Sequence, residues 1–251
     1  MSRMQYIELK AGRALEHLEA LKLAIQAYYD STPYEISHLK KPEIGRRVLR
    51  IDLKDPSDTV YLLAGDFAHN LRSTLDHVVY ALIVHSTKDL PDSAQVQWPV
   101  QIKEDTKTFE RQTKDVPPEA AAIIESLQPY HEGLDDAYKQ SAIWQLHKLD
   151  IVDKHRRIAI NEHALESYFP SLSKSSDFTT EVVNNGYEIS FPIDAPPVEM
   201  LLNPNPTVLF GDSEECLFLD AERLGTIFEF VVKDVLPRFS CFFAESASGC
   251  G

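Results

Sequence analysis

The sequence predicts an α+β fold, a helical bundle with long amphipathic helices plus a small antiparallel β-sheet. Three observations lead to this prediction. Apolar residues recur at helical spacing through residues 3–30 and again from 58 to about 84. Apolar and polar residues alternate in short segments near 34–53 and within 157–203. Asn184-Asn185-Gly186 is a typical turn for a β-hairpin.

A single domain is expected over residues 1–251, because a chain of this length with 43% hydrophobic residues can bury one core. Its mainly helical part, 1–156, contains the short hairpin near 34–53. A β-rich part, 157–203, and a C-terminal helix, 220–239, complete the domain. The last helix has one apolar face, which should pack on the core.

The N-terminal part is expected to run helix, hairpin, helix. Pro33 ends the first helix, because the residue before a proline is driven out of the helical conformation. Residues 34–39 and 47–53 should pair as strands across a turn at 41–45. Asp58 is the expected N-cap of the second long helix.

Shorter elements follow that helix. Residues 95–102 have the character of a strand or extended segment, and Pro99 would keep it at a sheet edge. The remaining expected elements are helices at 106–111, from 117 to 128–130 and at 136–153, and strands at 157–162, 179–183, 188–193 and 198–202.

Composition narrows the class of function. The net charge of −14 argues against a broad phosphate-binding surface, so any nucleic-acid contact needs a local basic cluster. The sequence has neither a run of about 20 apolar residues nor the apolar core of a signal peptide. Its three cysteines include no Cys-x-x-Cys pair, which indicates reduced thiols. We therefore expect a cytoplasmic protein without membrane contact.

The second long helix carries an unusual polar stripe. Residues 58–86 contain no Glu and no Lys, although these two residues usually form the solvated face of a helix. About half of the circumference instead holds Asp66, His69, Asn70, Arg72, Ser73, Asp76, His77 and Tyr80. Short polar side chains of this kind are often held by partners, so the stripe predicts contact with another helix or a cleft. The alternative is a surface helix of unusual composition.

A second polar cluster lies at the end of the helix expected at 136–153. His147 shares a face with Trp144 and Ile151, so its ring should be at least partly buried. Asp150 and Lys154 flank this histidine at i+3 and i+7.

The helix dipole accounts for the basic residues 154–156 near a helix C-terminus, but it disfavours Asp150 and Asp153 there. Asp153 should therefore hold a partner, with Arg72 or His77 of the other helix as candidates. Because isolated buried charges are costly, we expect the two polar helices to pack against each other.

Metal binding is one alternative use of these groups. Asp66 with His69, and His147 with Asp150, have the i, i+3 spacing of helical metal ligands, as in a metal-binding helical bundle. However, the chain has no His-Glu-x-x-His, and its one Glu-x-x-His lies in a predicted strand. We expect no metal and no cofactor.

Arg72 and His77 match the Arg-x4-6-His motif, and in this the chain resembles the HEPN superfamily, helical proteins that include many ribonucleases of bacterial toxin and defence systems. The resemblance implies a metal-independent endoribonuclease. Arg72 would stabilise the phosphate charge, and His77 would act as general acid or base. Residues 154–156 would add an anion site. The residue after the arginine, often Asn in that family, is Ser73 here.

The chain also resembles a set of uncharacterised bacterial proteins that share three segments, here Leu71 to Asp76, Gln128 to Tyr130 and Leu146 to Arg156. The HEPN resemblance further implies RNA as a partner and a homodimer formed through the helix with the polar stripe. The alternative from another class is a non-catalytic interaction protein, in which the His, Asp and Arg network is structural.

Overall fold

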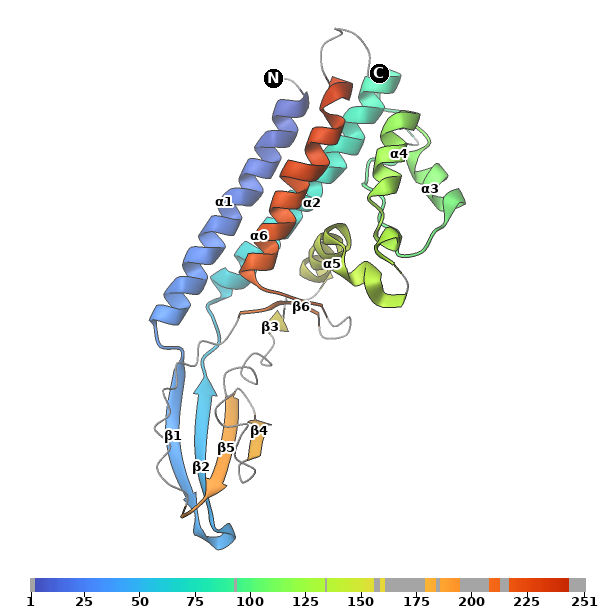
Figure 1. Ribbon diagram of the computed structural model, residues 1–251. Helices are drawn as coiled ribbons and strands as arrows, with labels where there is room; N and C mark the ends of the chain where they lie inside the picture. Colours follow the sequence, from blue (N-terminus) through green and yellow to red (C-terminus); the bar gives the residue numbers. More distant parts are fainter. Residues whose placement is uncertain are drawn as a thin grey trace.

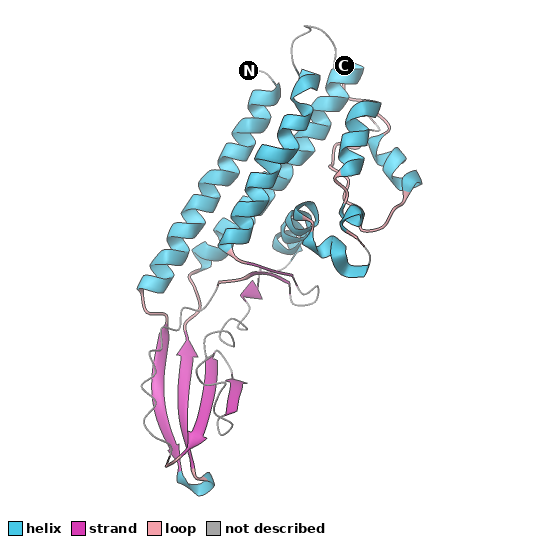
Figure 2. Cartoon of the chain, viewed as in Figure 1, coloured by secondary structure: helices cyan, strands magenta, loops and turns pink. Residues whose placement is uncertain are grey.

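The computed structural model confirms the α+β fold, with long helices and small antiparallel sheets (Figure 1). Figure 2 shows the α-helices gathered at one end of the molecule and the larger sheet at the other, with a short 3-10 helix, Pro42–Ile44, at the tip of the sheet. The structure describes residues 3–92, 94–133, 135–155, 159–160, 179–183, 186–194, 208–212 and 217–243.

Three long helical segments run side by side in the bundle: α1 (Arg3–Asp30), α2 (Asp58–Thr87) and α6 (Ala221–Glu229) (Figure 1). α6 continues as a π-helix, Phe230–Val235, and then as a 3-10 helix, Leu236–Phe243. Each segment turns an apolar stripe inward, because apolar residues recur every three or four positions. The buried residues of α1 are Ile7, Ala11, Ala14, Leu18, Leu21 and Ile25.

α2 lies at the centre of the main core, because both α1 and α5 (Ala142–His155) pack against it. Its side chains Phe67, Leu71 and Leu75 are among the largest that are fully buried. The short helical elements that follow α2 are α3 (Thr106–Thr113), α4 (Pro118–Ser126) and the 3-10 helices Pro129–Glu132 and Asp135–Gln140. This arrangement leaves one side of α2 facing α5 and another facing α1.

The larger sheet projects from the end of the bundle at which α1 leads into β1 and β2 leads into α2 (Figure 1). Its strands, in spatial order, are β1 (Tyr34–Lys41), β2 (Arg46–Leu53), β5 (Gly186–Pro192) and β4 (Thr179–Val183). All neighbours are antiparallel, and the hairpin register pairs Tyr34 with Leu53. The sheet has its own small apolar cluster of Leu49, Ile51 and Ile189.

A second antiparallel sheet contains one strand within the predicted range 157–162 and two strands that the sequence does not predict. Its strands, in spatial order, are β3 (Ala159–Ile160), β6 (Phe210–Asp212) and β7 (Leu217–Leu219). Strands this short give too few residues for an alternating pattern to stand out. Phe210 joins the main core, so this sheet closes the end of the bundle from which α6 starts.

The segment 95–102, predicted as a strand or extended segment, is not a strand. Its backbone amides donate to side chains instead: Trp98 N to Asp76 Oδ1 at 2.8 Å, and Gln101 N to Gln128 Oε1 at 2.9 Å. Gln128 Nε2 also donates to the Pro99 carbonyl at 3.1 Å. Backbone groups that are satisfied by side chains cannot also form a ladder with a neighbouring strand.

Several predicted boundaries shift. α2 continues to Thr87, and its N-cap is Ser57 rather than Asp58, which is the first helical residue. The helix expected at 136–153 begins as α5 at Ala142, after a separate 3-10 helix. The strand expected at 198–202 and the turn residues 184–185 lie outside the described residues. The strands predicted at 34–39, 47–53, 179–183 and 188–193 are confirmed.

Gly186 should tolerate no side chain. A Cβ built there would overlap the backbone carbonyl of Ile51 on the paired strand β2. We expect Gly186→Ala to lower the free energy of unfolding by about 1–3 kcal/mol, because the strands must separate to admit the methyl group. Gly225→Ala is the matched control, since its Cβ would meet open space on α6 and should stabilise that helix by about 0.5–1 kcal/mol. Urea denaturation measures the free energy of unfolding, which should fall in Gly186→Ala and rise in Gly225→Ala.

Candidate functional site

The two polar segments meet where α2 packs against α5, as the sequence predicts. Among the described residues, two side-chain hydrogen bonds cross between the helices, one from His69 to Asp150 and one from Arg72 to His147. The full charges pair within their own helices, one turn apart: Arg72 with Asp76, and Lys154 with Asp150. The network therefore has two centres, Arg72 and Asp150.

Arg72 is buried, with 6% of its surface exposed, and its guanidinium has three acceptors. One terminal nitrogen donates to Asp76 Oδ1, and the other donates to the Trp98 carbonyl at 2.7 Å. Nε lies 3.4 Å from His147 Nδ1. Because a guanidinium can only donate, this side chain ties α2 to the segment around Trp98 and to α5.

His147 is held neutral by its surroundings. Burial, and after it the charge on Arg72, lowers the pKa of this imidazole to about 4, against an opposing effect of Asp150. Its Nδ1 faces an Arg72 N–H, so that nitrogen accepts and the proton of the neutral ring resides on Nε2. His147 is thus an acceptor for Arg72 near neutral pH.

Asp150 is the second centre, and it positions an exposed histidine. Its side chain is 5% exposed, whereas that of His69 is 57% exposed. His69 Nδ1 lies 3.1 Å from Asp150 Oδ1, and Lys154 Nζ lies 2.6 Å from Oδ2. The buried carboxylate thus fixes one ring nitrogen of His69 and leaves Nε2 for other partners. This is the arrangement of an oriented general base.

Asp153 lies against the backbone of α2 rather than beside Arg72 or His77. A Cβ on Gly65 would overlap its carboxylate, so the glycine allows α5 to approach α2 at this point. Partial burial, together with the carboxylates of Asp150 and Asp66, raises the pKa of Asp153. Asp66 itself lies 3.9 Å from the imidazole of His17 on α1.

His77 faces α1, away from the Arg72 network. Its ring packs edge-on against Tyr6 of α1, with centroids 5.0 Å apart, and against Tyr80 at 6.4 Å. Burial, followed by the charge on Lys10, lowers the pKa of His77, and Asp76 acts in the opposite direction. The two residues of the Arg-x4-6-His motif therefore have different neighbours.

The remaining predicted site residues make no described contact between α2 and α5. Asn70 donates its side-chain amide to the Asp66 carbonyl at 2.8 Å, and Ser73 is half-buried on α2. The side chain of His155 and all of Arg156 lie outside the described residues. Sequence reasoning missed Gly65 and the backbone of Trp98. Only Gly65 carries a signal, because a glycine inside a long helix usually has a packing reason.

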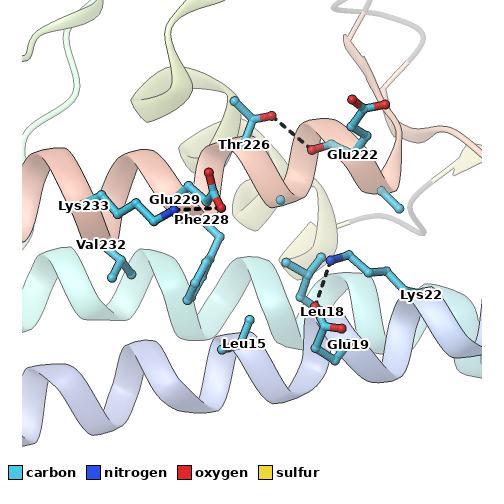
Figure 3. A pocket seen from close by; sticks show the side chains of 12 residues that line it. Leu15, Leu18, Glu19, Lys22, Glu222, Thr226, Phe228, Glu229, Val232 and Lys233 are labelled. Carbon is cyan, nitrogen blue, oxygen red and sulfur yellow. Dashed lines mark hydrogen bonds and ion pairs between the residues drawn. The ribbon is translucent and has the colours of Figure 1, made fainter.

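A groove of about 690 Å³ lies elsewhere, between α1 and α6 (Figure 3). Leu15, Leu18 and Phe228 line its apolar part. Its two lysines are engaged along their own helices, with Lys22 bonded to Glu19 and Lys233 paired with Glu229. The groove therefore lacks the converging buried polar groups that mark a reactive centre.

No protein-family model matches the chain, and no curated protein or solved structure matches it either. Among the described residues, no three His, Cys, Asp or Glu side chains gather in a way that could hold a metal ion. Within the same residues, no helix combines the length and apolarity needed to cross a bilayer. The assignment of a function therefore rests on the residues at the α2–α5 contact.

Replacing Arg72 should destabilise the fold. Arg72→Met removes the donors to Asp76 and the Trp98 carbonyl, and we expect a loss of about 3 kcal/mol in the free energy of unfolding. Arg13→Met is the control, because its exposed guanidinium pairs with exposed Glu16 and should change stability by less than about 1 kcal/mol. Equal denaturation midpoints for the two variants would contradict a structural role of Arg72.

The lowered pKa of His147 couples stability to pH. In the folded chain the ring takes up a proton only near pH 4, whereas in the unfolded chain it does so near its ordinary pKa of about 6.5. Between these values the unfolded state binds more protons, so stability falls as the pH is lowered, by at most about 1.4 kcal/mol per pH unit.

His147→Gln should flatten this dependence, because its amide oxygen still accepts from Arg72 but does not titrate near neutral pH. Denaturation midpoints of both proteins across this pH window provide the measurement. A variant that keeps the wild-type slope would show that another group causes it.

Proposed function

We propose that this chain is a metal-independent endoribonuclease in which His69 acts as the general base. The observation that carries the proposal is the His69–Asp150 pair, an exposed imidazole held through Nδ1 by a buried carboxylate. Such a carboxylate fixes the ring and stabilises the imidazolium that forms when Nε2 takes a proton.

RNA is the substrate class that this pair fits best. Within the described part of the chain, Asp150 is the hydrogen-bond partner of His69, and no hydroxyl or thiol side chain is bonded to that ring. RNA brings its own nucleophile, the 2′-hydroxyl group. His69 would accept its proton as O2′ bonds to phosphorus. The P–O5′ bond would then break, and a proton from solvent would complete the new 5′-hydroxyl.

Among the described residues, Lys154 is a cation in direct contact with this pair. Its ammonium bonds the far oxygen of Asp150 and is 48% exposed, so it can also face a phosphate oxygen. The HEPN resemblance implies the same reaction with Arg72 and His77 in these roles. The proposal keeps the reaction and the helix but transfers the base to His69. The reason is that Arg72 is occupied by protein acceptors and His77 faces α1.

A second candidate is a non-catalytic interaction protein, and the burial of Arg72 favours it. Arg72 has 6% exposure, and each of its three guanidinium nitrogens donates to a protein acceptor. A satisfied network of this kind fixes one packing arrangement without chemistry. The two candidates differ in the role of His69: it is the general base in the ribonuclease, whereas in the interaction protein it only adds one partly buried hydrogen bond to the fold.

Cleavage of a single-stranded RNA labelled at its 5′ end tests the choice. We expect His69→Gln to lower the cleavage rate by about 100-fold or more, the usual loss when a general base is removed. Asp150→Asn should lower the rate while leaving the imidazole in place. Activity should persist in EDTA.

His131→Gln is the matched control, because His131 is an exposed histidine that also pairs with a carboxylate, that of Glu125. It should cleave at the wild-type rate. Full activity in His69→Gln would exclude His69 as the base. If the wild type cleaves no RNA, and His69→Gln has the same free energy of unfolding as the wild type, the interaction protein is the better assignment.

A further inference from the structure

We propose that Tyr6, His77 and Tyr80, with Lys10 and Arg13 beside them, form a stacking surface for the bases of single-stranded RNA. We call these five residues the α1–α2 seam. The inference rests on the proposed function, since it names the part of the chain that would hold the strand cleaved at His69. It uses His77, which the mechanism above leaves without a role.

The aromatic rings of the seam contact one another, yet both tyrosines remain partly exposed. His77 lies between the two tyrosines, with interplanar angles of 79° to Tyr6 and 87° to Tyr80. Tyr6 is 42% exposed and Tyr80 is 41% exposed, so part of each ring remains free. Rings that are already held in place lose little side-chain entropy when a base stacks on them. Such stacking is tolerant of sequence, because every base has a π-face.

Positive charge accompanies these rings in an otherwise acidic protein. Tyr6, Lys10 and Arg13 are spaced by four and three residues, so they share one face of α1. Lys10 is close enough to His77 to affect its titration. Arg13 pairs with Glu16, and both side chains are more than half exposed. An exposed pair of this kind contributes little, so a phosphate can replace the carboxylate readily.

The seam and the proposed reaction centre lie on the same helix, with the rings of His77 and His69 about 80° apart around its axis. His77 and His69 are eight residues apart on α2, which corresponds to about 12 Å along the helix axis. Asn70 and Ser73 lie on the helix between them. A strand stacked on Tyr6 and Tyr80 would therefore reach His69 within a few nucleotides. A duplex would not serve, because its bases are stacked on one another and their faces are covered.

Binding without cleavage tests the seam. The probe is a fluorescently labelled 2′-O-methyl oligouridine, which lacks the nucleophilic hydroxyl, and anisotropy gives its Kd. We expect Tyr6→Ala and Tyr80→Ala each to weaken binding at least fivefold. Tyr6→Phe and Tyr80→Phe should bind like the wild type, because they keep the ring. Leu23→Ala is the control, since Leu23 is 73% exposed elsewhere on α1 and should leave Kd unchanged.

The outcomes separate the seam from the proposed function. An unchanged Kd in both alanine variants overturns the inference, even if cleavage of unmodified RNA by the wild type upholds the ribonuclease. Tight ring-dependent binding by a wild type that cleaves nothing supports the seam and rejects the ribonuclease. Equal affinity for a duplex overturns stacking. If the alanine variants instead convert a dimer to a monomer in light scattering and bind the probe normally, the seam is the interface of the expected homodimer and the inference fails.

Discussion

A buried guanidinium needs protein acceptors for its nitrogens, and this requirement organises the helical half of the molecule. Arg72 meets it with groups from three separate parts of the chain: Asp76 one turn along α2, the Trp98 carbonyl and His147 of α5. Asp76 in turn accepts from the Trp98 amide, so the arginine and the carboxylate together hold one peptide segment at both polar groups of one residue. Because an unpaired buried charge is costly, the positions of α5 and of this segment are specified together.

The sequence was sufficient for the long helices because their apolar residues repeat over many turns, as in α1 and α2. It was also sufficient for the packing of the two polar helices on each other. The charged pairs, however, form within each helix rather than between the two, Arg72 with Asp76 and Lys154 with Asp150. Residues 95–102, predicted as a strand or extended segment, do not form a strand although the alternation of one is present, because Asp76 and Gln128 accept from backbone amides of this segment. Contacts between a side chain and a distant backbone leave no periodic trace in a sequence, and the same holds for the carbonyl that Arg72 bonds.

The candidate site shows the same limit at finer scale. His69 and His77 belong to one polar stripe and look equivalent in the sequence. Eight residues rotate the helix by about 80° beyond two turns, so one ring meets Asp150 of α5 and the other meets Tyr6 of α1. The spacing between Arg72 and His77 can be read from the sequence. Whether the two side chains can act together depends on which neighbouring helix each of them faces. That direction is set by packing, and only the fold supplies it.

The apolar cluster of the larger sheet, Leu49, Ile51 and Ile189, is separate from the main core among the described residues. Parts of a protein with separate cores can open independently, each with its own free energy. The β1–β2 hairpin is local in the chain, but β5 joins it from more than a hundred residues away, as in the pairing of Ile51 with Tyr187. Completing the sheet therefore requires closure of a long loop, and its amides should exchange with solvent through openings that leave the α1–α2 core intact.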